Sequence, residues 1–198
     1  MYKEFVDNEA KRFLEVVGNQ LDSDSVKYLQ AGELAFEDAN FYMKKEITGL
    51  SNLVEVIEPS NDEEVGIRNI QGSKLPSLQN LILKRVILGY ATDAAITDPA
   101  KLAFSAVKPG TAVPALQNGE LIIEQDDKPI FRMPVSSLLN PVAPQSLSEV
   151  GYSLENWRLI KADRAFSVKI RFANGETVDA VAKHHIEVTL VGTKTRKR

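Results

Sequence analysis

The strongest constraint on the fold is a two-residue alternation of apolar and polar side chains from Ala165 to Phe172. Successive side chains of a β-strand point to opposite faces, so this period predicts a strand with one buried and one solvated face. Asn174-Gly175 follows directly, and this dipeptide is typical of a type I′ hairpin turn. We therefore expect a returning strand from Thr177 to Ala182.

Similar segments recur through the second half of the chain. Asp126-Asp127 separates two of them, which predicts a second hairpin, and Pro129 and Pro134 favour an edge position because proline has no N–H to donate. About eight strands favour an antiparallel β-sandwich that resembles a jelly roll. The further candidates are Leu81 to Leu88, Leu102 to Val107, Glu120 to Glu124, Ile130 to Val135, Trp157 to Lys161 and His184 to Gly192.

The first eighty residues show helical periodicity instead. A first helix with one apolar face is expected to end at Gly18. A second helix is expected to begin near Ser23 to Ser25 and to continue through Met43. Residues 58–78 are polar and rich in Pro and Gly, which indicates a boundary. The predicted organisation is a helical arm over residues 1–57, a connector over 58–78 and a β-sandwich domain over 79–198.

Composition and charge narrow the class of protein. The chain has 198 residues, of which 43% are hydrophobic, and it has no cysteine, so disulfides and thiolate zinc sites are excluded. No apolar run approaches the roughly 20 residues that span a bilayer, so no membrane span is expected. Residues 1–64 contain six Lys and Arg against fifteen Asp and Glu, a net charge of −9, which leaves +6 for the remainder. This split in charge fits an acidic arm that lies on a basic surface of its own chain or of a neighbouring chain. It fits equally well two solvated surfaces that differ in charge.

Residue types that support catalysis are few. In His184-His185-x-Glu187, adjacent strand residues face opposite sides, so only His185 and Glu187 could share a metal ion. Ser136-Ser137 fits a strand end better than a nucleophile, and phosphate, dinucleotide and hydrolase motifs are missing. We therefore expect no enzyme, no cofactor and no metal.

The basic segment from Lys194 to Arg198 reads as a solvated tail. It is too short, and too poor in aromatic residues, for a nucleic-acid groove, so nucleic-acid binding is not expected.

A helical arm followed by Gln79 to Asp93, Asn118 to Ile123, Ile130 to Pro134 and Phe166 to Phe172 resembles small jelly-roll virion proteins, including coat and capsid-associated proteins of bacteriophages. The resemblance implies a structural subunit, present in many copies, that is made in the host cytoplasm and located in the virion. Its arm would contact neighbouring copies or other structural subunits.

The function expected from the sequence is therefore self-assembly through subunit interfaces. The alternative is a non-catalytic module for carbohydrate or receptor recognition that uses loop aromatics such as Tyr90, Tyr152 and Trp157. For assembly, the expected interface residues are the apolar residues of the arm: Phe5, Phe13, Leu14, Val17, Leu34, Phe36 and Phe41.

Overall fold

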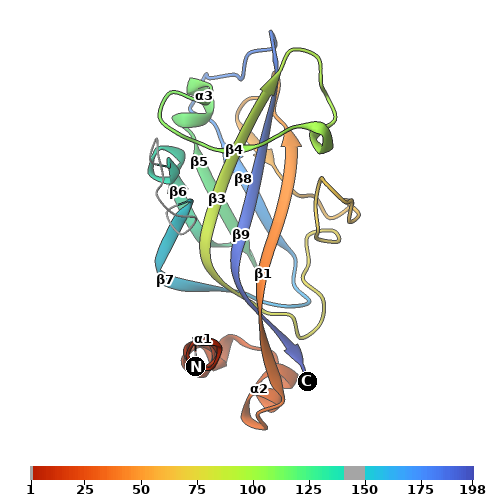
Figure 1. The fold of residues 1–198 in the computed structure, drawn as a ribbon, viewed down its shortest axis with the longest axis vertical. Helices are drawn as coiled ribbons and strands as arrows, with labels where there is room; N and C mark the ends of the chain where they lie inside the picture. Colours follow the sequence, from red (N-terminus) through yellow and green to blue (C-terminus); the bar gives the residue numbers. More distant parts are fainter. Residues whose placement is uncertain (1, 141–149) are drawn as a thin grey trace.

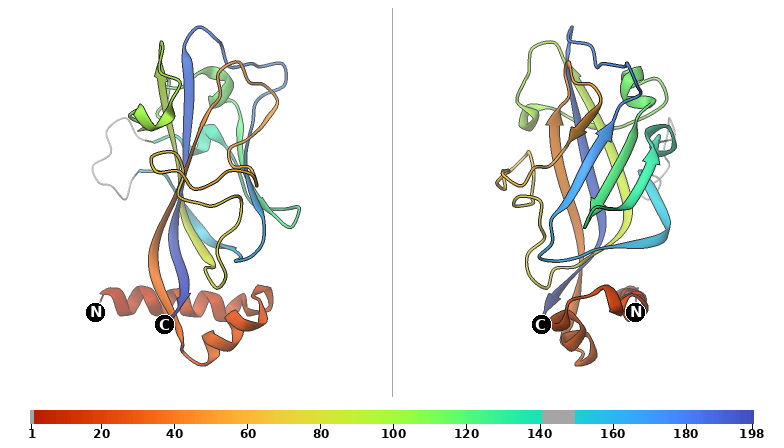
Figure 2. Two further views of the ribbon diagram at one scale, coloured as in Figure 1. Left: turned by 90° about the vertical axis from the view of Figure 1, so that its right-hand side faces the viewer. Right: turned by 180° about the vertical axis from the view of Figure 1, so that it is seen from behind.

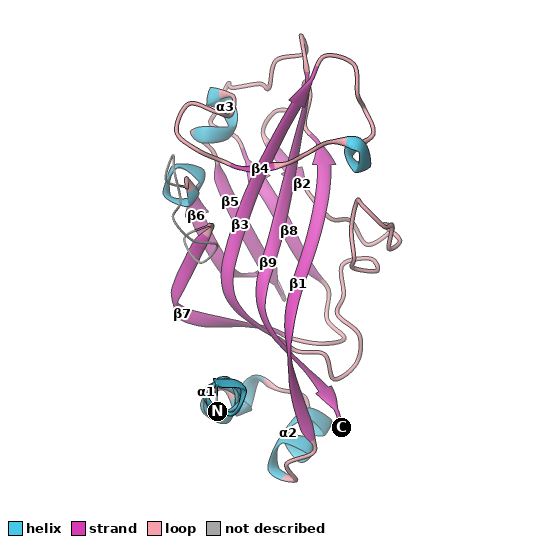
Figure 3. Cartoon of the chain, in the orientation of Figure 1, coloured by secondary structure: helices cyan, strands magenta, loops and turns pink. Residues whose placement is uncertain are grey.

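A computed structural model describes residues 2–140 and 150–198, with side chains described from Asn8 onward. These residues form two antiparallel β-sheets packed face to face, with two helices at one end (Figure 1, Figure 3). The predicted mainly β, antiparallel architecture is confirmed, with nine strands in the described part of the chain. Within it, no helix is both long and apolar enough to span a bilayer. The helices are α1 (Tyr2–Val16), α2 (Ser23–Gln30) and α3 (Pro114–Gln117); the strands are β1 (Leu34–Glu46), β2 (Leu53–Glu55), β3 (Leu81–Asp93), β4 (Ser105–Ala106), β5 (Glu120–Gln125), β6 (Lys128–Pro134), β7 (Tyr152–Ile160), β8 (Phe166–Arg171) and β9 (Lys183–Lys197).

The two sheets enclose one large core. The larger sheet has the order β1-β9-β3-β4, with β7 also paired to β3, and the smaller has the order β2-β8-β5-β6. Strands pair across the sequence, β1 with β9, β2 with β8, β3 with β7 and β5 with β6. The alternation predicted for β8 is confirmed, since Phe166, Val168 and Ile170 are buried and the residues between them are not. Fully buried side chains from both sheets include Leu83, Leu88, Leu121, Ile123, Val168, Ile170, Val188 and Leu190.

The predicted β5–β6 hairpin is also present. Asp126 and Asp127 have φ angles of 54° and 57°, as a type I′ turn requires at both central residues. β6 pairs with β5 alone, so Pro129 and Pro134 lie on an edge strand as expected.

The prediction of a second helix through Met43 is wrong. α2 ends at Gln30, Gly32 follows with a φ of +69°, and the next residues form β1. β1 pairs with β9 over all thirteen of its residues, from Leu34 to Glu46. This long-range pairing outweighs the local pattern, so the second half of the expected helical arm belongs to the sheets.

The returning strand expected from Thr177 to Ala182 is absent. β8 has β5 on one side and β2 on the other, so neither edge is open to a further strand. Of the turn dipeptide, Gly175 has a positive φ and Asn174 does not, which differs from a type I′ turn. Thr177 makes a single bridge to Ser51.

The C-terminal segment is a strand rather than a solvated tail. β9 continues to Lys197, and with β1 it forms a two-stranded ribbon that extends beyond the sandwich to α1 and α2 (Figure 2). Glu37 of β1 pairs with Arg196, and its carboxylate lies 3.9 Å from Lys194 Nζ. The acidic and basic segments of the sequence thus meet within one chain.

A second, smaller core lies where the ribbon meets the helices. Leu14 of α1 is fully buried there, together with Ile82 of β3 and Leu159 of β7. The rings of Phe13 and Trp157 pack with their centroids 5.9 Å apart. α1 is therefore held on the outer face of the larger sheet by apolar contacts.

Candidate functional site

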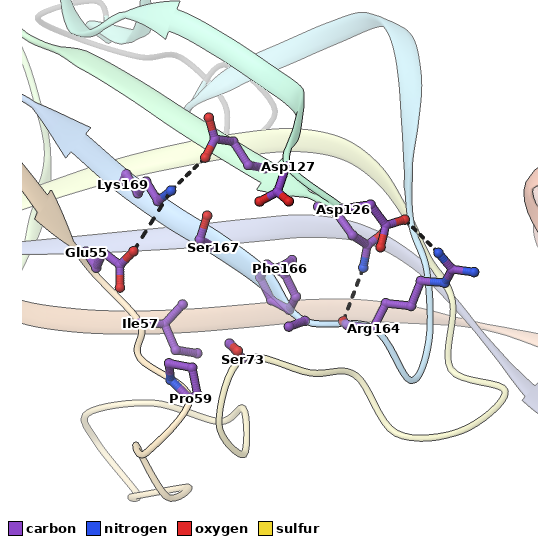
Figure 4. A pocket seen from close by; sticks show the side chains of 13 residues that line it. Glu55, Ile57, Pro59, Ser73, Asp126, Asp127, Arg164, Phe166, Ser167 and Lys169 are labelled. Atoms are coloured by element: carbon purple, nitrogen blue, oxygen red, sulfur yellow. Dashed lines mark hydrogen bonds and ion pairs between the residues drawn. The ribbon is translucent and has the colours of Figure 1, made fainter.

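An open pocket of about 460 Å³ lies on the outer face of the smaller sheet (Figure 4). Because β8 alternates, Ser167 and Lys169 point outward into this pocket while Phe166 closes its base. Lys169 Nζ lies 2.7 Å from the Glu124 carboxylate of β5 and 3.9 Å from that of Glu55 in β2. One lysine thus joins three adjacent strands across the pocket wall.

The far wall of the pocket is the β5–β6 turn. The Asp126 carboxylate lies 2.7 Å from Lys161 Nζ and 2.9 Å from an Arg164 guanidinium nitrogen. The hydrogen bond from Lys161, reinforced by the one from Arg164, lowers the pKa of Asp126. Buried Gln125 fixes this wall by bonding the main chain of Lys161 in both directions, at 2.9 and 3.0 Å.

The charges of this pocket favour binding over proton transfer. Four carboxylates, those of Glu55, Glu124, Asp126 and Asp127, face three cations: Lys169 and Arg164 in the lining, and Lys161, which contacts Asp126 from beside it. The excess of negative charge favours the binding of a ligand with a cationic or neutral polar group in this pocket. A general acid needs a carboxyl with a raised pKa, whereas the pKa of Asp126 is lowered.

A second polar cluster closes the end of the sandwich opposite the helices. Tyr90 Oη lies 2.5 Å from His184 Nδ1, and the two side chains are 7% and 5% exposed. His184 Nε2 lies 3.2 Å from the Asp179 carboxylate. Burial raises the pKa of Tyr90, and the His184 imidazole lowers the pKa of Asp179. With Nδ1 unprotonated, the tyrosine hydroxyl donates to it.

Hydrogen bonds of this second cluster connect loops to the strands. The His184 main chain accepts from the N–H of Ile47 at 2.8 Å, and its own N–H donates to Thr48 Oγ1 at 2.9 Å. Asp179 also accepts from the N–H of Val181, so the residues before β9 are tied to the end of β3 through His184. With Tyr90 and His184 both buried, the cluster suits stabilisation of loops better than contact with a substrate.

The two adjacent histidines face opposite ways, as the strand pattern predicts. His184 contacts Tyr90, whereas His185 lies on the outer face with Nε2 3.3 Å from the Thr97 carbonyl oxygen. Glu187 shares that face and lies 3.6 Å from Lys44 Nζ. In the described ranges, no three His, Asp or Glu side chains gather at a possible metal site.

The aromatic residues expected on recognition loops lie on strands, so that expectation is wrong. Tyr90 belongs to β3 and is buried. Tyr152 and Trp157 belong to β7, where the ring centroid of Tyr152 lies 6.1 Å from that of Phe131 and Trp157 packs on α1. They form no common platform.

Ser136 and Ser137 are exposed in a short 3-10 helix, Val135–Leu138. No hydrogen bond joins either serine to a histidine within the described residues.

The predicted interface residues are mostly covered by their own chain. Leu14 and Leu34 are buried in the smaller core, and Phe13, Val17 and Phe36 pack against it. Phe41 packs against the main core, and the side chain of Phe5 lies outside the described residues. Contact of these residues with another subunit stays a prediction.

Sequence reasoning missed both polar sites for one reason. Their members come from distant parts of the chain: Tyr90 and His184 are 94 positions apart, and Lys169 and Glu124 are 45 apart. The alternation of β8 did indicate that Lys169 faces solvent. No pattern in the sequence identified the carboxylates that Lys169 contacts.

Comparison with known proteins adds no relative: no protein-family model matches the chain, and no curated protein matches it.

Proposed function

We propose that this protein is a structural subunit that assembles with copies of itself and with other structural proteins in a virion, after synthesis in the host cytoplasm. Its two sheets would form a jelly roll, the architecture found in many capsid proteins. The resemblance noted in the sequence and the strand pairing described above support this proposal together.

The observation that best supports the proposal is the nested pairing of the strands. Without the two-residue β4, eight strands remain, and the first pairs with the last, the second with the seventh, the third with the sixth, and the fourth with the fifth. One long hairpin rolled into two sheets has this pattern. The resulting sheet orders, β1-β9-β3-β7 and β2-β8-β5-β6, interleave early and late strands as a jelly roll does.

The ribbon and its helices give a reason to propose assembly rather than an isolated domain. α1 and α2 lie outside the sandwich, at the end of the β1–β9 ribbon (Figure 2). Val16 at the end of α1 is 83% exposed although it is apolar. We take this end of the molecule as the surface where copies meet, with Val16 as a side chain that a neighbouring copy would cover.

Analytical ultracentrifugation and electron microscopy of the purified protein test this proposal directly. We expect a concentration-dependent, closed multimer of defined size without added ligand. Val16→Asp should weaken self-association, whereas Val181→Asp should not, because Val181 is 94% exposed but belongs to the loop before β9, at the opposite end. A wild-type protein that stays monomeric at all concentrations would reject the proposal.

The pocket on the smaller sheet favours a second candidate, a non-catalytic binding module. Jelly rolls also occur in lectins. The pocket offers carboxylates, two cations and Ser167 within about 460 Å³. Glycan-array binding that is lost in Lys169→Ala, by a protein that remains monomeric, would favour this candidate over assembly.

A further inference from the structure

The cations of the pocket on the outer face of the smaller sheet are already paired. Lys169 Nζ lies 2.7 Å from the Glu124 carboxylate. Lys161 Nζ and an Arg164 guanidinium nitrogen lie 2.7 and 2.9 Å from the Asp126 carboxylate. An anionic ligand would have to compete with these carboxylates for each cation, because all three contacts are at hydrogen-bond distance. The pocket is therefore a poor site for an anion.

Two carboxylates of the same pocket are not engaged in this way. Glu55 lies 3.9 Å from Lys169 Nζ, which is longer than a hydrogen bond. The Asp127 carboxylate makes no ion pair or hydrogen bond with another described residue, and the hydroxyl of Ser167 makes no hydrogen bond with one either. Figure 4 shows Ser167 between these two carboxylates. The pocket thus contains negative charge and hydrogen-bond acceptors that its own chain does not use.

A buried hydroxyl is a second, independent indication of a ligand. Ser73 is 3% exposed, and its side chain lines the pocket next to Phe166 (Figure 4). Its carbonyl oxygen accepts a hydrogen bond from the Phe166 N–H at 2.8 Å, which fixes the residue in place. No described residue makes a hydrogen bond with its hydroxyl. Buried polar groups in folded proteins rarely lack a partner, and a ligand in the pocket would supply one.

The arrangement of the carboxylates indicates an organic cation rather than a metal ion. Calcium and magnesium need several oxygen ligands around one point, whereas no three His, Asp or Glu side chains of the described residues gather in this way. An ammonium group has three N–H donors that can reach separate acceptors. Ile57, Pro59 and Phe166 also line the pocket, and these apolar residues suit the methylene groups of an alkyl chain.

We propose that this pocket binds a primary ammonium group at the end of an alkyl chain. Glu55 and Asp127 supply the negative charge, and the hydroxyls of Ser73 and Ser167 accept further N–H groups. The inference rests on the second candidate function, ligand binding at this pocket, and it names the chemistry of the ligand. Free aliphatic amines and the lysine side chains of a partner protein share this chemistry.

Titration with n-pentylamine tests the proposal, with the main-chain amide NMR signals of isotope-labelled protein as the readout. At about pH 7 the amine is protonated, as a lysine side chain is. We expect saturable shifts at Ser167 and Asp127. Titration with n-pentanol, which has the same alkyl chain and no charge, should produce none.

Asp127→Asn removes one of the two unpaired carboxylates and should weaken pentylamine binding at least about tenfold, because a charge-assisted hydrogen bond is lost. Asp127 has a φ of 57°, which asparagine also adopts readily, so the turn should be kept. Glu176→Gln is the matched control, because it changes the net charge equally. Glu176 is exposed in the loop after β8, outside the pocket, so this variant should bind like the wild type.

Lys169→Met is a second variant, for which a gain of binding is expected. Methionine keeps the apolar stem of the side chain and removes the ammonium group that contacts Glu124. The ammonium group of the ligand can then take its place beside Glu124 and Glu55, so pentylamine should bind more tightly than to the wild type. A neutral sugar would instead lose a hydrogen-bond donor and bind more weakly. The direction of the change therefore distinguishes the two kinds of ligand.

A third titration identifies the source of the ammonium group. If a short peptide with one central lysine binds as tightly as pentylamine, the ligand is a lysine side chain of a partner protein. If pentylamine binds and the peptide does not, the ligand is a free amine. Either result supports the proposed chemistry.

The remaining outcomes separate this inference from the function on which it rests. Pentylamine shifts that do not saturate, or equal binding by Asp127→Asn and the wild type, would overturn the inference. If the wild type binds a glycan on the array and does not bind pentylamine, the inference is wrong and the binding module stands. A wild type that binds neither rejects both the inference and the binding module.

Discussion

Replacing Leu14 by alanine should reveal whether α1 is part of the cooperatively folded unit. Leu14 is fully buried between α1 and the outer face of the larger sheet, beside Ile82 and Leu159. Truncating a buried leucine removes its transfer free energy and leaves a cavity, which together cost about 2–5 kcal/mol. For a chain of this length, each kcal/mol lowers the melting temperature by about 2–4 °C, so a decrease of roughly 5–15 °C is expected.

The single tryptophan makes the experiment specific. The Trp157 ring packs on Phe13 of α1 at a centroid distance of 5.9 Å, so its fluorescence reports on the attachment of α1, while far-UV circular dichroism reports on the sheets. In Leu14→Ala the two probes should lose their signals together, at a lower temperature than in the wild type. Val16→Ala is the control, because Val16 is 83% exposed on the same helix and its truncation should change neither midpoint.

Two results would refute this reasoning. If Leu14→Ala melts like the wild type by both probes, the leucine does not stabilise the fold. If the fluorescence midpoint falls and the dichroism midpoint does not, α1 detaches from a sandwich that remains folded. The helix would then be available to a neighbouring copy, as first expected from the sequence.

Three further predictions concern the polar cluster at the end of the sandwich away from the helices and the packing of β9 against β3. Tyr90→Phe should lower the free energy of unfolding by about 1–3 kcal/mol in urea titrations, because the buried His184 nitrogen loses its hydrogen-bond partner; an unchanged midpoint would show that the bond does not stabilise the fold. The pKa of Asp179 is lowered in the folded state, so its carboxylate stabilises the fold above its unfolded pKa and loses this effect as the pH falls through the folded pKa. Asp179→Asn should therefore destabilise most at about pH 6 and progressively less as the pH falls below about 4, the ordinary pKa of an aspartate, and equal destabilisation throughout would contradict the contact between Asp179 and His184. Gly192→Ala should prevent correct folding or lower the melting temperature sharply, because a Cβ at this position would collide with a carbonyl oxygen of β3. Gly18→Ala is the control: it has open space around it and should keep the wild-type melting temperature.

The parts of the fold that the sequence predicted are those set by local chemistry. The alternation over Phe166 to Arg171 identified β8 and its buried face, and Asp126-Asp127 with its flanking prolines identified the β5–β6 hairpin and its edge position. In each case neighbouring residues determine the outcome. Such signals are readable without knowledge of the remaining chain.

The errors occurred where distant pairing decides the structure. Residues 34–46 have apolar spacings that also fit a helix, and their pairing with β9, some 150 positions later, makes them a strand. Asn174-Gly175 turns the chain, but β5 and β2 already occupy both edges of β8, so no hairpin forms. The candidate sites depend on distance in the same way, since Lys169 and His184 each meet partners from other strands.

The position of β9 also affects how the chain can fold during synthesis. β9 lies between β1 and β3 in the larger sheet, yet it follows both in sequence by about a hundred residues or more. Until residues 183–197 have left the ribosome, β1 and β3 lack the strand that joins them, and each exposes an unpaired edge. Pairings so distant in sequence form slowly, and exposed edges promote aggregation. Yield in cells should therefore depend on chaperones that protect the nascent chain, and a premature stop before β9 should produce insoluble protein rather than a smaller soluble domain.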